Sequence, residues 1–253
     1  MIQRLEGSLQ AQDRIICALD VPTSEQAIQL VRLLSGQVSV YKVGLELLMN
    51  AGIQVVDRIY EAGARRVFLD AKLHDIPNTI AGAMRGVARS RAWCVTVHCA
   101  GGAAMLRAAR DAAESHSAEL GVTRPLVLGV TLLTSLNGTA LHDELQVVAA
   151  VPNHVAHLAC LAYSAGCDGV IASPHEIETV RRTVSDPDFL IITPGVRPEG
   201  TAHGDQARVM TPGEAIRRGA DYVVIGRPIV GNSDPVAATT RIAADISLDL
   251  QAH

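Results

Sequence analysis

The sequence predicts a (β/α)8 TIM barrel that forms a single domain over residues 1–253. Short β-branched and apolar runs alternate with longer stretches of helical period, which is typical of βα units in a parallel sheet. Eight such units fit into this length, as in other barrels of this class. An open doubly wound sheet usually has fewer units and a Gly-x-Gly-x-x-Gly motif after its first strand, and that motif is absent here.

The predicted strands are short apolar runs bounded by turn residues. Their side chains alternate between two faces, so residues two apart point the same way. We expect strands at residues 14–20, 38–43, 66–72, 93–98, 125–131, 168–172, 189–193 and 221–225.

A helix is predicted after nearly every strand. Thr23 and Ser24 begin the first, and Pro77 occupies a favoured first-turn position in another. The connection at residues 132–151 is long enough for short helical turns. Further helices are expected at residues 46–61, 77–91, 102–115, 152–165, 174–184, 211–219 and 235–250.

The composition indicates a soluble globular protein. Hydrophobic residues make up 48% of the chain and the net charge is −4, so the basic excess of a nucleic-acid-binding protein is absent. The five cysteines form no Cys-x-x-Cys pair, which is typical of reduced cytosolic thiols. Neither a secretory signal nor an apolar run of about 20 residues is present. We therefore expect a cytoplasmic protein that binds neither nucleic acid nor membrane.

Charged side chains gather where the first three predicted strands end. Asp20, Lys42, Asp70 and Lys72 lie at consecutive strand ends, and Asp75 follows at the next turn. In a barrel the carboxyl ends of the strands form the functional face. Alternating carboxylates and ammonium groups at this face predict an active site. A structural network of salt bridges is the alternative, because such networks also bring charges together.

A second group of polar residues is predicted after the seventh and eighth strands, where barrels often bind phosphate. Arg197 follows the seventh strand, and Gly226 and Arg227 follow the eighth, offering open backbone and a bidentate guanidinium. Gln206 could add a donor from the loop at residues 195–208, which has the length and glycine content of a lid. An ordinary turn with a surface arginine, in a merely flexible loop, is the alternative.

Other polar residues carry weaker signals. Thr131, Thr134 and Ser135 follow the fifth strand, where they could face a polar ring, although Ser and Thr also form turns. His154 and His157 lie one helical turn apart without nearby carboxylates or cysteines, as on a solvated helix face. We therefore predict no metal site.

The most distinctive stretch is Phe68-Leu69-Asp70-Ala71-Lys72-Leu73-His74-Asp75-Ile76-Pro77-Asn78-Thr79. It resembles the catalytic signature of the orotidine 5′-phosphate decarboxylase family. Ala71 is the one departure, since a larger aliphatic residue is usual, and we expect it to face away from the substrate. Similar segments occur in order along nearly the whole chain: Ala18-Leu19-Asp20, Lys42-Val43-Gly44, Leu133-Thr134-Ser135, Thr193-Pro194-Gly195-Val196-Arg197-Pro198, Gly204-Asp205-Gln206 and Ile225-Gly226-Arg227-Pro228.

The resemblance implies decarboxylation of orotidine 5′-phosphate to UMP by a homodimer with shared active sites and no metal or organic cofactor. Lys72 would donate a proton to pyrimidine C6, between Asp70 and Asp75 of the partner subunit. Lys42 would complete this catalytic array. The implied substrate-binding residues are Asp20, Lys42, Asp70, Ile76, Thr79, Thr134, Ser135, Pro194, Arg197, Gln206, Gly226 and Arg227.

These residue types suit the implied chemistry. Loss of CO2 from C6 of orotate leaves a carbanion without a conjugated electron sink, which must be stabilised electrostatically. Neighbouring carboxylates favour the charged form of Lys72, so it suits an acid better than a Schiff-base nucleophile. Binding of the remote phosphate would orient the pyrimidine.

Two alternatives remain open. A Mg²⁺-dependent sugar-phosphate decarboxylase or synthase of the same superfamily shares Asp-x-Lys-x-x-Asp. The Ile76-Pro77-Asn78-Thr79 extension, the Leu133-Thr134-Ser135 element and Gln206 favour the orotidine 5′-phosphate enzyme. A non-catalytic phosphate-binding barrel is the second alternative, but it would not need the alternating charges of Asp20, Lys42, Asp70 and Lys72.

Overall fold

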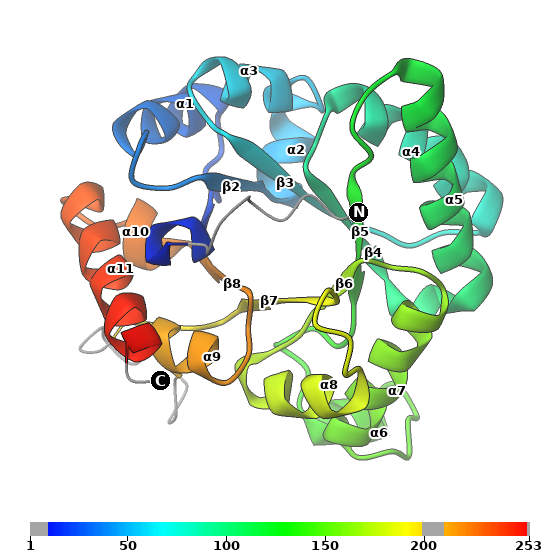
Figure 1. Ribbon diagram of the computed structural model, residues 1–253. Helices are drawn as coiled ribbons and strands as arrows, with labels where there is room; N and C mark the ends of the chain where they lie inside the picture. Colours follow the sequence, from blue (N-terminus) through cyan, green and yellow to red (C-terminus); the bar gives the residue numbers. More distant parts are fainter. Residues whose placement is uncertain (1–9, 199–209, 252–253) are drawn as a thin grey trace.

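Within residues 10–198 and 210–251, which the computed structural model describes, eight parallel strands close into a barrel (Figure 1). Neighbouring strands pair in sequence order, and β8 closes the barrel by pairing with β1. The predicted fold class is therefore confirmed. The strands are β1 (Ile15–Ala18), β2 (Val40–Val43), β3 (Arg66–Leu73), β4 (Cys94–His98), β5 (Leu126–Val130), β6 (Gly169–Ile171), β7 (Leu190–Pro194) and β8 (Tyr222–Ile225).

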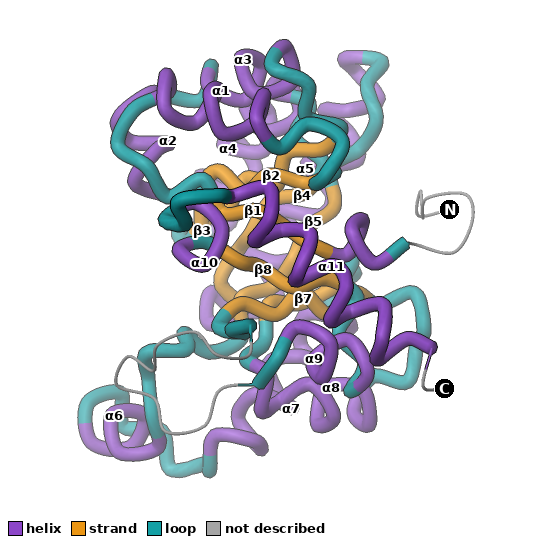
Figure 2. Tube along the Cα trace, turned by 90° about the vertical axis from the view of Figure 1, so that its left-hand side faces the viewer, coloured by secondary structure: helices purple, strands orange, loops and turns teal. Residues whose placement is uncertain are grey.

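Helices surround the barrel (Figure 1). The α-helices are α1 (Ser24–Leu33), α2 (Leu45–Ala51), α3 (Val55–Glu61), α4 (Pro77–Ser90), α5 (Gly102–Leu120), α6 (Gly138–Asp143), α7 (Val151–Ser164), α8 (Ile177–Thr183), α9 (Pro212–Arg217), α10 (Arg227–Val230) and α11 (Pro235–Gln251). Short 3-10 helices are η1 (Ala11–Arg14), η2 (Cys99–Gly101) and η3 (Pro174–Glu176). In Figure 2, α2, α6 and α10 lie on the left, at the end toward which the strands run.

Local sequence explains where several helices begin. The Thr23 hydroxyl accepts a hydrogen bond from the Gln26 backbone N–H at the start of α1, which satisfies a donor that has no partner inside the helix. Pro77 begins α4, where its missing N–H costs no helical hydrogen bond. These two predicted helix starts are confirmed.

Glycine positions explain two differences from the predicted helices. The helix predicted over residues 46–61 is interrupted after α2, because Gly52 adopts a φ of 71° that ends the helix. The helix predicted to end at residue 115 continues to Leu120, and Gly121 ends it with a φ of 64°. Residues without a side chain adopt such conformations at little cost.

The apolar core has an inner and an outer layer. Alternate strand residues such as Phe68 and Cys94 fill the barrel interior, whereas their neighbours Leu69 and Val95 pack outward with the helices. Burial of a large apolar side chain stabilises the fold by about 1.5–3 kcal/mol. Because side chains fill the interior, a ligand has room above this layer, at the ends of the strands.

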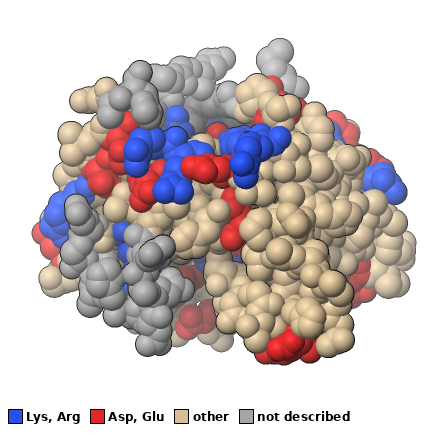
Figure 3. Space-filling view, turned by 90° about the horizontal axis from the view of Figure 1, so that it is seen from below, with Lys and Arg blue, Asp and Glu red and all other residues tan. Residues whose placement is uncertain are grey.

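The surface carries interleaved charges. Figure 3 shows Lys and Arg side chains beside Asp and Glu side chains along the upper part of the face seen from below. Ion pairs of this kind include Arg218 with Glu214, at 2.6 Å between Nη2 and Oε1. In the part of the chain that the structure describes, no helix is long and apolar enough to cross a membrane.

Candidate active site

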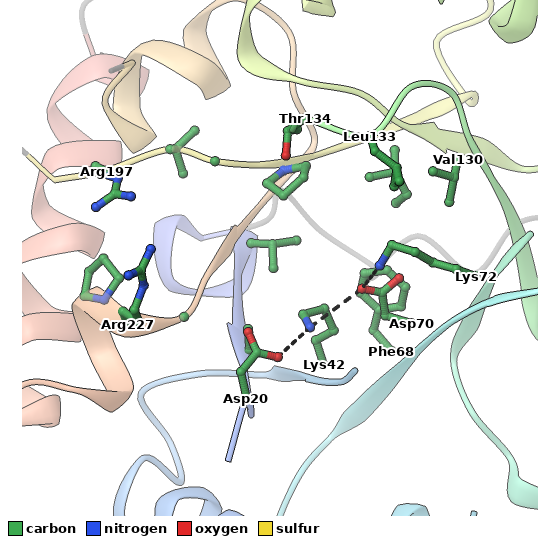
Figure 4. Close-up of a pocket in the computed structure, with 18 of the residues that line it drawn as sticks. Asp20, Lys42, Phe68, Asp70, Lys72, Val130, Leu133, Thr134, Arg197 and Arg227 are labelled. Atoms are coloured by element: carbon green, nitrogen blue, oxygen red, sulfur yellow. Dashed lines mark hydrogen bonds and ion pairs between the residues drawn. The ribbon is translucent and has the colours of Figure 1, made fainter. Parts of the chain in front are cut away.

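A cavity of about 340 Å³ opens at the C-terminal ends of the strands. This volume lies near the lower end of the range of about 300–1,000 Å³ that is typical of small-molecule sites. Phe68, Val130 and Ile171 contribute an apolar base. Arg197 and Arg227 lie at one end and Lys72 at the other (Figure 4). The cavity therefore suits a ligand with a flat, weakly polar middle and anionic groups.

Ammonium and carboxylate groups alternate along one wall of the cavity (Figure 4). The Nζ atom of Lys42 lies 2.9 Å from Asp20 Oδ1 and 3.6 Å from Asp70 Oδ2. Asp70 Oδ2 also lies 2.7 Å from Lys72 Nζ. The side chains of Lys42 and Asp70 are 10% and 12% exposed, whereas that of Lys72 is 30% exposed. Lys72 is thus the more accessible of the two ammonium groups.

The third strand reaches this geometry through a bulge that periodicity did not predict. Leu69 pairs with Val95, but the next paired residues are Leu73 and Val97, so residues 70–72 lie opposite residue 96. Within the bulge Lys72 has a φ of 46°, in the left-handed region that residues other than glycine rarely adopt. Lys72 and Asp70 are neighbours as predicted, but not through regular strand alternation.

Gly44, directly after β2, leaves room for the charge array, which consists of Asp20, Lys42, Asp70 and Lys72. A Cβ at this position would lie 2.8 Å from Lys42 Nζ and 3.1 Å from Asp20 Oδ1. Any larger residue would therefore push the ammonium group away from its carboxylate partner. This crowding is the physical reason for glycine in the Lys42-Val43-Gly44 segment.

Two arginines line the end of the cavity opposite Lys72. Arg197 follows β7 and Arg227 begins α10, and their guanidinium groups point toward one another in Figure 4. A Cβ on Gly226 would meet Asp20 Oδ2 and Ala18 Cβ only at ordinary contact distances of 3.4 and 3.5 Å. Guanidinium groups bind phosphate through paired hydrogen bonds, so this end suits a phosphate.

In the described segments, 10–198 and 210–251, no group of three or more His, Cys, Asp or Glu side chains is arranged so that it could hold a metal ion. Ammonium groups lie beside the carboxylates of Asp20 and Asp70.

Known proteins share both this sequence and this fold. The model of the orotidine 5′-phosphate decarboxylase / HUMPS family matches residues 13–242. The chain belongs to this family. The orotidine 5′-phosphate decarboxylase of Moorella thermoacetica is 49% identical over 240 residues, covering 95% of this chain and 94% of that protein. The enzyme of that name from Syntrophomonas wolfei is 42% identical over 239 residues, covering 94% and 99%.

A solved structure of the family supports the fold independently. The crystal structure of orotidine 5′-phosphate decarboxylase from Lactobacillus acidophilus has a TM-score of 0.81 and 36% identity. The match covers 92% of this chain and 99% of that chain. The barrel described above is therefore the fold of this decarboxylase family.

Most residues predicted for the site line one cavity, although they come from widely separated parts of the chain. Ala71 is partly buried and packs against the outer core rather than the cavity, as expected. The predicted residues that line the cavity are Asp20, Lys42, Asp70, Lys72, Thr134, Pro194, Arg197, Gly226 and Arg227.

Other predicted residues lie elsewhere. Asp75, Ile76 and Thr79 are exposed beyond the end of β3 and are not among the described residues that line this cavity. Ser135 is also exposed and outside the lining. Gln206, with the loop proposed as a lid, lies outside the described residues.

Sequence reasoning missed Thr96, which contacts both Asp70 and the backbone of Lys72. A polar residue in the otherwise apolar run of β4 was the available signal. A second overlooked signal is the scarcity of lysine. Lys42 and Lys72 are the two lysines among 22 Lys and Arg residues of the sequence, and both line this cavity.

Proposed function

We propose that this chain decarboxylates orotidine 5′-phosphate to UMP, with protonated Lys72 as the acid that protonates C6. The observation that carries this proposal is that one cavity holds a lysine–aspartate pair at one end and a pair of arginines at the other. Lys72 Nζ contacts Asp70 at 2.7 Å at one end, and Arg197 and Arg227 line the other. A pyrimidine nucleotide has a reacting ring and a phosphate with a ribose between them, and it matches this arrangement.

The orientation of the substrate follows from the lining residues. Its phosphate would bind Arg197 and Arg227, while its ribose hydroxyls would contact Asp20 and Lys42. The pyrimidine would then lie over the apolar base, with Thr134 facing its polar edge. Binding at the phosphate end holds the ring against the charge array, which converts remote binding energy into orientation.

The chemical step requires one bond to break and one to form. The C6–carboxylate bond breaks, CO2 leaves, and the electron pair remains on C6, which then takes a proton from Lys72 Nζ. The positive charge of Lys72 stabilises this electron pair as it develops. Asp70 repels the substrate carboxylate in the ground state, and the repulsion disappears as CO2 departs.

The scarcity of lysine supports the role of Lys72. A guanidinium has a pKa above about 12 and does not give up a proton readily, whereas an ammonium group can act as an acid. A chain that otherwise uses arginine for positive charge has lysines at two positions. Both are in the cavity, where a proton donor is required.

The remaining predicted residues suggest a shared site between two copies of this chain. Asp75, Ile76 and Thr79 follow β3 and are exposed in the single chain. Large apolar side chains, those of Leu45 and Met49, are also exposed on α2, which follows β2. We infer that these surfaces meet in a homodimer, in which Asp75 of the partner subunit lies beside Lys72.

The proposed activity is tested by following the loss of orotate absorbance with orotidine 5′-phosphate, with and without EDTA. We expect turnover that EDTA does not diminish. Strict dependence on Mg²⁺, or activity on a sugar phosphate instead, would favour the alternative within this family.

The role of Lys72 is tested with two variants. Lys72→Ala removes the acid and Lys72→Arg keeps the charge without a usable proton. Both should lower kcat by at least about 10²–10⁴-fold, while nucleotide binding is retained. A fully active Lys72→Arg variant would show that proton donation by this side chain is not required.

Sharing of the active site is tested by subunit exchange. Lys72→Ala and Asp75→Ala homodimers should each be nearly inactive. After random exchange, half of the dimers contain one intact site of two, so activity should recover to about a quarter of the wild-type value. Absence of recovery, with exchange demonstrated by tagged subunits, would contradict a role for Asp75 in the partner's site.

A further inference from the structure

Thr96 lies directly behind the charge array without reaching the cavity. It occupies the middle of β4, opposite the bulge formed by residues 70–72 of β3. Its side chain is completely buried and is not part of the cavity lining. A bound substrate would therefore contact Asp70 and Lys72 but not Thr96.

The hydroxyl of Thr96 connects both members of the catalytic pair. It accepts a hydrogen bond from the backbone N–H of Lys72 at 2.9 Å. It also donates to Asp70 Oδ1 at 3.0 Å. The other oxygen of that carboxylate, Oδ2, is the one that contacts the ammonium groups of Lys72 and Lys42.

We propose that Thr96 is a positioning residue of this active site, whose hydroxyl holds the Asp70 carboxylate and the Lys72 backbone in the geometry required for catalysis. The inference rests on the proposed roles of these two residues. It adds a requirement that the function alone does not impose. The active site needs a buried side chain that donates one hydrogen bond and accepts another at the same time.

The bulge explains why such a group is needed. Residues 70–72 depart from the regular ladder, and a buried N–H without a partner is costly. The Thr96 hydroxyl takes the place of a strand carbonyl for Lys72, and thereby supports a φ of 46° that this residue would rarely adopt by itself.

The hydrogen bond to Asp70 has a separate effect. Donation to Oδ1 fixes the rotation of the carboxylate, so that Oδ2 stays directed at the two ammonium groups. Valine has nearly the same shape as threonine but cannot donate this hydrogen bond, whereas serine keeps the hydroxyl.

The experiment compares Thr96→Val and Thr96→Ser with Thr239→Val as a matched control. Thr239 is also buried, and its hydroxyl donates to a backbone carbonyl, that of Pro235, on α11 far from the site. We expect Thr96→Val to lower kcat by about 10- to 100-fold and to change KM for orotidine 5′-phosphate by less than about threefold, because the phosphate end is untouched. Thr96→Ser should retain most of kcat, and Thr239→Val should match the wild type.

A spectroscopic readout separates positioning from general stability. Selective ¹³Cε-lysine labelling gives signals from two residues only, and the Lys72 signal, assigned with Lys42→Arg, should shift in Thr96→Val alone.

The proposal is overturned if folded Thr96→Val keeps kcat within about threefold of wild type, or if its lower kcat is matched by Thr96→Ser. If Thr96→Val does not fold, Thr96→Ser and Thr96→Ala replace it, and equal activity of these two overturns the proposal. An active Lys72→Ala variant in the same assay would instead refute the proposed catalytic role, which keeps the two failures distinguishable.

Discussion

His98 shows how the site environment acts on a single residue. It ends β4, and its ring lies 5.2 Å from that of His74. Burial lowers the pKa of His98 below its ordinary value of 6.5, and the nearby charges of His74 and Lys72 lower it further. The folded protein therefore favours the neutral form of this imidazole.

This lowered pKa predicts a pH dependence of stability. Below about pH 6.5 the unfolded chain binds more protons at this residue than the folded protein, so stability present above pH 6.5 declines as the pH falls. His98→Asn should reduce the difference between unfolding free energies measured in urea at pH 7.5 and pH 5.5. His142→Asn, at an exposed position, is the control, and an equal pH dependence in both variants would contradict the prediction.

Burial also determines the reactivity of the cysteine thiols. Desolvation raises the pKa of Cys17 and of Cys167 to about 12, whereas Cys160 is exposed on α7. The thiolate is the reactive form of the side chain. None of the five cysteines forms a disulfide, as predicted. Burial keeps all of the thiols except that of Cys160 away from solvent.

At the level of elements, the close packing of β6 against β7 depends on Gly169. A Cβ on this residue would lie 2.4 Å from the backbone oxygen of Leu190 and 2.7 Å from its Cβ. The neighbouring strand cannot move away without opening the barrel. By contrast, a Cβ on Gly86, in the middle of α4, would meet nothing within 4 Å.

These two glycines make opposite predictions for the same substitution. Gly169→Ala should lower the free energy of unfolding by about 1–3 kcal/mol, because an overpacked contact strains the surrounding backbone. Gly86→Ala should raise it by about 0.5–1 kcal/mol, because alanine favours the helix and restricts the unfolded chain. Urea denaturation of both variants measures the difference, and destabilisation of equal size would contradict this account.

On the scale of the whole molecule, the proposed active site and the buried ion pairs lie at opposite ends of the barrel. Asp168 precedes β6 and is 7% exposed; it contacts Arg124 at 2.7 Å and accepts a hydrogen bond from the Val127 backbone N–H. Arg181 and Asp221 form another such pair at 2.6 Å, before β8. These ion pairs connect strand beginnings, whereas the charge array occupies strand ends.

Removal of one residue from such an ion pair should therefore lower the stability of the fold and leave the rate of decarboxylation unchanged. Asp168→Ala should destabilise the fold by about 3–5 kcal/mol, since it leaves the partly buried Arg124 with only the more exposed Glu114 carboxylate at 3.4 Å and removes the acceptor of the Val127 N–H. Asp57→Ala, which removes an exposed partner of Arg91, should change stability by less than about 0.5 kcal/mol. Thermal unfolding and decarboxylase assays at 25 °C test both variants, and a large loss of kcat in folded Asp168→Ala would contradict this separation.

The sequence predicted much of this arrangement because its signals are periodic or positional. Alternating apolar runs locate the strands, and the carboxyl ends of parallel strands meet at one face. Asp20, Lys42 and Asp70 could therefore be placed together without knowledge of any contact. The interruption at Gly52 was not predicted, because a glycine is compatible with a helix until packing favours a positive φ.

The sequence by itself determined the barrel, its charged rim and the family signature. Tertiary structure decided which groups touch: the bulge at residues 70–72, the sharing of Asp70 Oδ2 between two lysines, and the hydrogen bond from Thr96, 26 residues further along the chain. Local periodicity carries no information about contacts between different strands at that separation. The register of β3 against β4 supplies it, and with it the geometry of the charge array.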